Sequence, residues 1–378
     1  MSVSLKHHRS VKIILIFPLL YIFLVGIKFI SISFGLFGSG FAEQLVSFYS
    51  NPFCGLFTGI LVTSLVQSSS ATTSLIVGLA GSGVLPLESA IPMVIGANMG
   101  STITSLLVSF TFVTRKEDFK RAFTAATMHD FFNVFTILVF FPLEIFFHII
   151  EKSALFLTDI FQNIGGIAFT SPVKIIIQPT TKFFQHLLLD TFGVADIAAG
   201  IILLIIAILI VVFSLVYLVK ILRSLVVNTT EKVLDRFLFR NTFTAFTLGM
   251  VLTAAVQSSA VTVSMVVGMV AAGFLDLNRA YPFALGANIG TTITALLASL
   301  VTLSADSGAV VSTIGLTVAL SHLMFNIYGI MIFLPLRKIP IYCATKFGEL
   351  ASGSKIWAVV FVICGFYLVP LGLIFLTR

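Results

Sequence analysis

Charged residues are scarce in this chain of 378 residues. Asp, Glu, Lys and Arg make up 10% of it, whereas hydrophobic residues make up 58%. A soluble domain of this size needs a charged surface, so the composition excludes a soluble globular protein and indicates one that sits in lipid. The net charge of +7 comes from short basic clusters between apolar runs. That pattern is typical of cytoplasmic loops and not of a surface that binds nucleic acid.

Cysteine is also rare. The three cysteines, Cys54, Cys343 and Cys364, are odd in number and lie in or beside apolar runs. They predict neither a disulfide framework nor a metal-ligand cluster. The sequence also lacks a supported nucleophile–base pair and a nucleotide-binding loop, so we expect neither an enzyme nor a cofactor.

What the chain does contain is one polar stretch in two copies. Each copy has a short tip, QSSS at residues 67–70 and QSSA at residues 257–260. Each tip is followed by a second motif, GANMGSTIT at 96–104 and GANIGTTIT at 286–294, with seven of nine positions identical. The offsets agree, since 257 − 67 = 190 and 288 − 98 = 190. We interpret this register as an internal duplication, a common feature of membrane transporters.

The apolar flanks of each tip are short. A dozen residues of helix extend about 18 Å, whereas the hydrocarbon core of a bilayer is about 30 Å thick. Neither flank can cross alone, so we predict a re-entrant helical hairpin over residues 53–80 and another over 243–271. One continuous span with a polar stripe is the alternative.

The second motif lies near the middle of a longer apolar run in each copy. Its glycines permit an unwound backbone, so we predict a discontinuous transmembrane helix over residues 86–113 and another over 281–303. Three crossings in the first copy would invert the second copy relative to the first. Every basic cluster, and the N-terminus, would then lie on the cytoplasmic side.

We therefore predict an all-α integral membrane protein with two inverted-topology repeats. The expected boundaries are repeat 1 over residues 1–150 with a return span at 122–150, an extracytoplasmic linker over 151–195, repeat 2 over 196–340 with a return span at 313–336, and a final span over 356–377.

The tips are candidate anion sites. Serines at a helix N-terminus cap free N–H groups and offer further donors to an anion. No Lys or Arg lies at this depth, so a bound anion would depend on helix N-termini, hydroxyls and co-bound cations. The alternative is that the small polar residues only allow helices to pack closely. The candidates are Gln67, Ser68, Ser69, Ser70, Gln257, Ser258 and Ser259.

The second motifs are candidate cation sites. Freed carbonyls, asparagine oxygens and threonine hydroxyls are hard oxygen ligands, which suit sodium. The candidates here are Asn98, Asn288, Thr102 and Thr104.

Asp130 is a candidate intramembrane acid, because it is a carboxylate well inside an apolar run. The alternative is an aspartate hydrogen-bonded to a neighbouring helix. His129 and Asn133 recur as His322 and Asn326, whereas the aspartate does not recur. We therefore expect the histidines to form hydrogen bonds between packed helices.

These motifs resemble the type II sodium-dependent inorganic phosphate cotransporter family. The paired tips, the paired second motifs, KRAFTAATMHDFFN at residues 120–133 and RAYP at 279–282 carry the resemblance. It implies sodium-coupled import of inorganic phosphate across the plasma membrane by alternating access, with both tips holding phosphate. It also implies a sodium site near Gln257, Ser258, Thr291 and Thr294, and the short loops suggest a bacterial member.

One departure from the pattern is Ala260, which replaces the last serine of the second tip. Spacing alone does not distinguish phosphate from another oxyanion. A passive anion channel also stays an alternative.

Overall fold

The computed structural model describes residues 2–37, 51–163, 172–233, 241–302 and 309–377, and these ranges contain helices and no strands. Seven helices there are long and apolar enough to cross a membrane. The chain is therefore a multi-pass membrane protein of the all-α class. The seven candidate spans are Ile14–Phe37, Leu87–Phe112, Lys116–Phe147, Asp196–Leu218, Leu277–Thr302, Thr313–Phe333 and Ile356–Thr377.

In both copies the predicted hairpin segment is divided into two short helices. Each predicted hairpin segment consists of two helices of 15 and 13 residues, too short to be candidate spans. A single continuous helix through either tip is therefore wrong, while re-entry from one membrane face stays a prediction. The helices of the first copy are α1 (Ser2–Phe37), α3 (Pro52–Val66), α4 (Ser69–Gly81), α5 (Leu87–Gly100), α6 (Ile103–Ser109) and α7 (Lys116–Phe147).

The segment between the copies is largely helical, and the second copy repeats the order of the first. Between the copies lie α8 (Ile149–Asn163) and α9 (Pro172–His186). The second copy contains α10 (Asp196–Val233), α11 (Thr242–Val256), α12 (Ser259–Ala271), α13 (Leu277–Thr302) and α14 (Ala309–Phe333). The chain continues with α15 (Lys338–Gly353), α16 (Ile356–Ile363), a π-helical turn (Cys364–Leu368) and α17 (Val369–Thr377).

The prediction of a discontinuous helix is wrong for the second copy. Helix α13 runs without a break through Gly286 and Gly290. In the first copy the helix is interrupted at Ser101 and Thr102, after both glycines, and these two residues keep right-handed helical dihedral angles.

Close packing explains these glycines. A Cβ atom on Gly96 would lie 1.9 Å from the backbone oxygen of Leu56 in α3, and one on Gly286 would lie 2.0 Å from that of Phe246 in α11. Small residues let the backbones of two membrane helices approach each other. The glycines therefore hold α5 against α3 and α13 against α11, and they do not unwind the helix.

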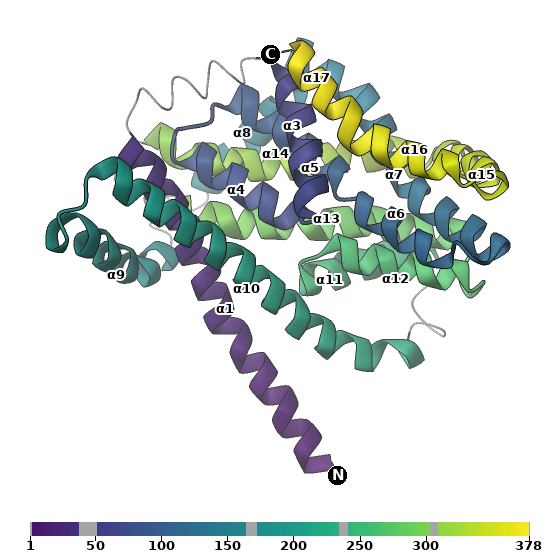
Figure 1. Cartoon of the computed structure of the whole chain (residues 1–378), viewed down its shortest axis with the longest axis horizontal. Coiled ribbons are helices and arrows are strands. Elements are labelled where there is room, and N and C mark those ends of the chain that lie inside the picture. The colour runs from purple at the N-terminus through teal and green to yellow at the C-terminus, as the bar shows by residue number, and fades with distance from the viewer. Residues whose placement is uncertain (1, 38–50, 164–171, 234–240, 303–308, 378) are drawn as a thin grey trace.

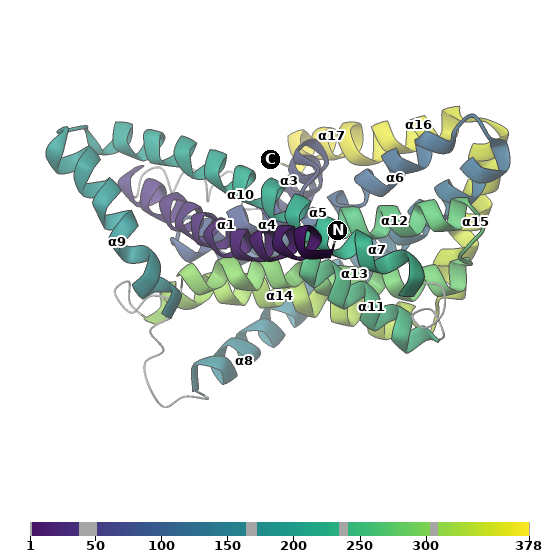
Figure 2. The same cartoon turned by 90° about the horizontal axis from the view of Figure 1, so that it is seen from below.

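The two copies are interlocked. Helix α4 of the first copy packs against α13 and α14 of the second, and α12 of the second packs against α6 and α7 of the first. The first helices, α1 and α10, also pack against each other (Figure 1). Each short second helix is thus covered by the opposite copy, which brings the two tips into one region. Figure 2 gives the same arrangement from below.

Candidate functional site

Each tip contains a glutamine whose backbone adopts the left-handed helical conformation. Gln67 has φ 55° and Gln257 has φ 54°, and their N–H groups donate to the carbonyl oxygens of Thr63 at 2.7 Å and Thr253 at 2.6 Å. A positive φ is uncommon for residues other than glycine, and it ends the first helix of each pair abruptly. The next residue is extended and begins the second helix.

That next residue is a serine in both copies. The hydroxyl oxygen of Ser68 accepts the N–H of Ala71 at 3.2 Å, and that of Ser258 accepts the N–H of Val261 at 3.4 Å. Each hydroxyl still has its own proton to donate. The first-turn N–H groups of α4 and α12 have no partner within their helices and carry the positive end of the helix dipole. Both tips therefore present hydrogen-bond donors suited to an anion.

The tips of the two copies touch each other. Ser70 donates its hydroxyl proton to the backbone carbonyl oxygen of Gln257 at 2.9 Å, and its oxygen lies 3.5 Å from Oγ1 of Thr294. Residue 260 is the counterpart of Ser70 and is alanine, so the second copy has no hydroxyl with which to return this bond. The single bond joins residues 187 positions apart.

The two glutamines differ in burial. Gln67 is exposed, whereas Gln257 is only 8% exposed. Within the described ranges, Oε1 of Gln257 is buried without a hydrogen-bond partner. A buried amide oxygen without a partner has lone pairs available for a cation or a donor.

Further hydroxyl groups lie on the helices of the second motifs. Thr291 donates to the carbonyl oxygen of Ala287 at 3.0 Å, and Thr102 donates to that of Met99 at 2.9 Å. A hydroxyl that donates its proton keeps oxygen lone pairs for a cation. Oγ1 of Thr104 is buried with no partner among the residues described. Among the predicted sodium ligands outside the tips, Thr294 has its hydroxyl oxygen 3.5 Å from that of Ser70, beside the meeting point of the tips.

The asparagines and histidines form a reciprocal pair of bonds between the copies. His129 of the first copy is bonded through Nε2 to Oδ1 of Asn288 in the second, at 2.7 Å. His322 of the second copy is bonded through Nε2 to Oδ1 of Asn98 in the first, at 3.1 Å. Asn133 accepts from the amide groups of both asparagines, at 3.0 Å and 3.1 Å. The expectation that the histidines join packed helices is confirmed.

The asparagines Asn98 and Asn288 were expected to bind a cation, and their part in this hydrogen-bond network was not predicted. Oδ1 of Asn98 also accepts from Asn326 at 3.3 Å, so the amide oxygens proposed as cation ligands are already engaged by protein donors. No direct hydrogen bond joins Asn98 or Asn288 to either tip in the described part of the chain. The signal that could have revealed the network was the duplication of both His and Asn in the return spans.

Asp130 is fully buried beside this network. Both of its carboxylate oxygens are buried, and the side chain of Thr102, which lies between α5 and α6, interacts with the carboxylate. An aspartate hydrogen-bonded to a neighbouring helix therefore stays an alternative. An ionisable group inside a membrane protein marks a functional site by default, and Asp130 stays a candidate.

One acidic cluster was missed by sequence reasoning. Ligand atoms of Glu144, His148 and Glu151 lie within 4.8 Å of one another at the junction of α7 and α8. The Glu144 carboxylate accepts the N–H of Ile150 at 2.6 Å, and His148 is bonded to Glu151 at 3.0 Å. These bonds account for the cluster as a cap on the start of α8.

Comparison with known proteins adds independent findings. A family model described as Na+/Pi-cotransporter matches residues 22–169 and 210–377. The chain is 30% identical to sodium-dependent phosphate transport protein 2B of Homo sapiens, over 95% of this chain and 64% of that protein. It is 31% identical to sodium-dependent phosphate transport protein 2A of Rattus norvegicus, over 96% of this chain and 67% of that protein.

The protein 2B of Pongo abelii is also 30% identical, over 95% of this chain and 64% of that protein. The chain thus spans about two thirds of the length of these relatives. No solved structure matches it.

Proposed function

Because this chain belongs to the Na+/Pi-cotransporter family, we propose that it is a sodium-coupled symporter that imports inorganic phosphate across the plasma membrane by alternating access. The family is one of transporters and not of enzymes. The observation that carries the proposal is the contact between the two tips, because it brings the N-termini of α4 and α12 to one place in an apolar protein. Phosphate and sodium are the transported substrates, and no further cofactor is needed.

Phosphate binds between the two tips. The O–H groups of Ser68 and Ser258 donate to its oxygens, and Ser69, Ser259 and the first-turn N–H groups add further donors. Gln67 and Gln257 contribute their side-chain amides. Ser70 holds the tips together, since its one hydroxyl proton is already donated to Gln257.

Sodium binds beside the phosphate. Oε1 of Gln257 and the hydroxyl groups of Ser258, Thr291 and Thr294 are its proposed ligands. The unpartnered oxygen of Gln257 supports this site. With no cationic side chain at the tips, phosphate binding alone would leave its desolvation cost uncompensated, which makes transport dependent on sodium.

Oxygen atoms of the first copy are proposed as further cation ligands. Thr102 and Thr104 are proposed as further sodium ligands, and Asp130 as an intramembrane acid that binds a cation. Asn98 and Asn288 act here through the bonds that they form with histidines, which hold the two copies together.

The membrane arrangement is part of the proposal. The two copies are inverted repeats, each pair of short helices is a re-entrant hairpin, and the N-terminus is cytoplasmic. The repeated helix order and the interlocked packing support this arrangement. The unequal exposure of Gln67 and Gln257 supports a site that opens to one side at a time.

The test is uptake of radiolabelled phosphate into proteoliposomes, with an inward sodium gradient or an equal potassium gradient. Accumulation above equilibrium with sodium alone is the expected result. Equal, non-concentrative flux in both would indicate a passive channel. If sodium drove no phosphate uptake but drove uptake of sulfate or another oxyanion, the substrate assignment would be wrong.

A further inference from the structure

Helix α15 differs from the helices on either side of it. It has 16 residues and is not among the candidate spans, yet it lies between two of them, Thr313–Phe333 and Ile356–Thr377. In Figures 1 and 2 it occupies the right-hand end of the structure and lies across the direction of α13 and α14. Helix α15 therefore covers one end of the spanning helices and does not run alongside them.

One face of α15 is occupied by the rest of the protein. Pro340, Ala344, Gly348 and Ala351 are buried. A Cβ atom on Gly348 would lie 2.0 Å from Oγ1 of Thr124 in α7, so the contact with α7 is tight. This packing fixes which face of α15 is open.

The open face combines apolar and basic side chains. Ile339, Tyr342 and Leu350 are 46%, 64% and 47% exposed. Trp357, just beyond α15, is 48% exposed. The lysines on this face and its continuation, Lys338, Lys346 and Lys355, are exposed as well. Apolar residues interleaved with lysines, and a tryptophan at the edge, are typical of a helix that lies in the membrane interface.

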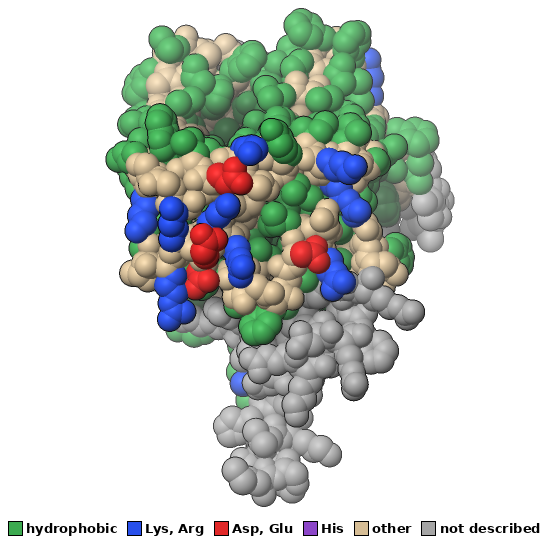
Figure 3. Space-filling model, turned by 90° about the vertical axis from the view of Figure 1, so that its right-hand side faces the viewer, with side chains coloured by type: hydrophobic (Ala, Val, Ile, Leu, Met, Phe, Trp, Pro, Cys, Tyr) green, Lys and Arg blue, Asp and Glu red, His purple; other side chains and the backbone are tan. Residues whose placement is uncertain are grey.

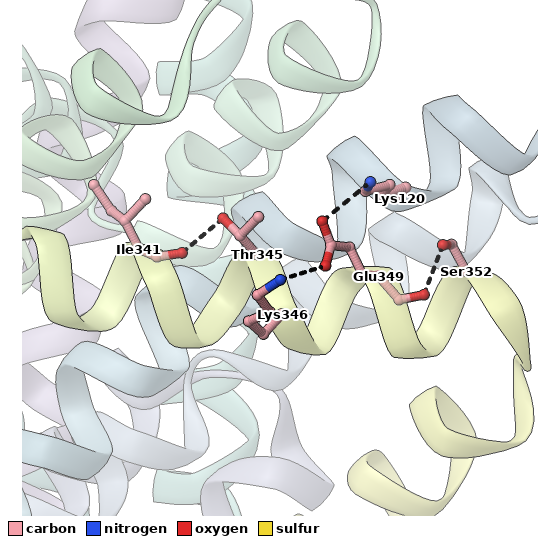
Figure 4. A network of polar contacts seen from close by, with 6 residues as sticks. All are labelled: Lys120, Ile341, Thr345, Lys346, Glu349 and Ser352. Carbon is pink, nitrogen blue, oxygen red and sulfur yellow. Dashed lines mark hydrogen bonds and ion pairs between the residues drawn. The ribbon is translucent and has the colours of Figure 1, made fainter.

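The positive charge of this face is only partly compensated. Glu349 is bonded to Lys346 at 3.1 Å and pairs with Lys120 of α7 at 3.6 Å (Figure 4). The bond to Glu349 raises the pKa of Lys346 above its usual value, so this lysine carries a positive charge as an unpaired lysine does. Across the described residues, Lys338 and Lys355 have no carboxylate within 4.0 Å.

The whole end of the structure carries excess positive charge. Along residues 337–355 there are four basic side chains and one acidic side chain, so the net charge is 4 − 1 = +3. Figure 3 shows Lys and Arg side chains gathered on this face, with fewer Asp and Glu among them and apolar surface above. A basic surface at the edge of the bilayer is electrostatically complementary to anionic lipid headgroups.

We propose that the open face of α15 and the start of α16 form a docking surface for anionic phospholipids. The three lysines bind headgroup phosphates, while Ile339, Tyr342 and Leu350 rest against the acyl chains. Charge complementarity and direct continuity with the last candidate span favour this occupant. Because α15 packs on α7, the bound lipid also braces the helix that carries His129 and Asp130.

The single tryptophan of the chain makes the surface measurable. Trp357 lies two residues after Lys355, so its fluorescence reports lipid at this face. The full-length protein is placed in nanodiscs that contain equal fractions of phosphatidylglycerol and phosphatidylcholine, with bromine on the acyl chains of one lipid or the other. We expect brominated phosphatidylglycerol to quench more strongly, with a local preference of about fivefold for each engaged lysine.

Matched variants locate the effect. The double variant Lys346→Gln/Lys355→Gln should reduce the preference to the roughly fivefold that Lys338 alone would give. The control Lys152→Gln/Lys182→Gln removes two exposed lysines from α8 and α9, away from α15, and should keep the preference. Equal quenching by both lipids in the unmodified protein would overturn the proposal. So would an undiminished preference in the first double variant, or a preference that disappears in the control.

One further arm distinguishes a bound lipid from a free anion as the source of the signal. Millimolar inorganic phosphate, added at constant ionic strength, should leave the preference unchanged. Loss of the preference would mean that a free anion, and not a lipid, occupies the face. The measurement needs neither sodium nor transport, so it can fail while the proposed symport holds, and the reverse is equally true.

Discussion

Ser70 on α4 donates its hydroxyl proton to the backbone carbonyl oxygen of Gln257, 187 positions further along the chain, at 2.9 Å, and so joins the tips of the two copies. A tip by itself is a helix N-terminus with a few hydroxyl groups. Two tips in contact form a site with donors on both sides. This contact is therefore the structural basis of the proposed substrate site.

Replacing Ser70 with alanine removes this bond and gives the first tip the residue that the second tip has at position 260. A hydrogen bond contributes about 0.5–1.5 kcal/mol net, so we expect the apparent affinity for phosphate to fall by up to about tenfold. The measurement is phosphate-dependent uptake in proteoliposomes. Ser82→Ala is the control, since the Ser82 hydroxyl donates to the carbonyl oxygen of Leu79 at the end of α4, within the same copy. An equal loss in both variants would argue against a special role for Ser70.

Gln67 and Gln257 allow the side chain and the backbone of each tip to be tested separately. Alanine at either position should reduce transport to the level of empty proteoliposomes, with insertion into the membrane intact. The left-handed backbone conformation costs about 1–3 kcal/mol for residues other than glycine. Glycine at either position avoids this cost, so it should raise thermal stability. It should not restore transport. Recovery of uptake with glycine would show that the backbone conformation matters and the amide does not.

The paired glycines should be intolerant of substitution. Gly96→Ala and Gly286→Ala place a methyl group about 2 Å from backbone oxygens of α3 and α11, so we expect a loss of roughly 3 kcal/mol or more in the free energy of unfolding. Gly268→Ala in α12 is the matched control, because nothing lies within 4 Å of its Cβ position. It should be neutral or stabilising by up to about 1 kcal/mol. Thermal unfolding of the purified protein in detergent measures all three.

The bonds between His129 and Asn288 and between His322 and Asn98 are suited to double-mutant cycles. Hydrogen bonds between membrane helices have coupling energies of about 0.6–1.7 kcal/mol, and we expect values in this range for each pair after alanine replacement. The non-bonded combination of His129 with Asn98 should show less coupling. Strict additivity for both bonded pairs would contradict the network.

Asp130→Asn replaces a buried carboxylate with a neutral amide of nearly the same shape. Because a charge at the centre of a membrane helix costs about 2.5–3.5 kcal/mol, we expect unchanged or higher thermal stability. We also expect a rise of about tenfold in the sodium concentration that gives half-maximal uptake. The exposed Asp276→Asn is the control. An unaltered sodium dependence in Asp130→Asn would exclude this carboxylate from the coupling machinery.

Much of the helical layout follows from the sequence. Two tips in one register predict two breaks, and the structure places those breaks at Gln67 and Gln257 because a left-handed residue followed by a capping serine ends one helix and begins another. The wrong expectation concerned the glycines of the second motif. Glycine allows both unwinding and close packing, and only the neighbouring backbones of α3 and α11 decide between the two.

Contacts between distant residues could not be predicted in this way. Nothing in the local pattern around Asn98 indicates that His322 will bond to it, since 224 positions separate them. Likewise, Ser70 was expected to bind substrate, and its proton is instead donated to the opposite tip. Such pairings depend on how the two copies pack, a global property of the fold that spacing within one copy does not contain.

The interlocking of the copies has a consequence for biosynthesis. The ribosome completes the first tip 190 residues before the second, which at about 5–20 residues per second takes roughly 10–40 s. During that interval α4 lacks α13 and α14, the helices that cover it in the finished protein. We expect the half-made chain to depend on the insertion machinery or on lipid for shelter, so a chain truncated after α7 should be recognised and degraded by quality control.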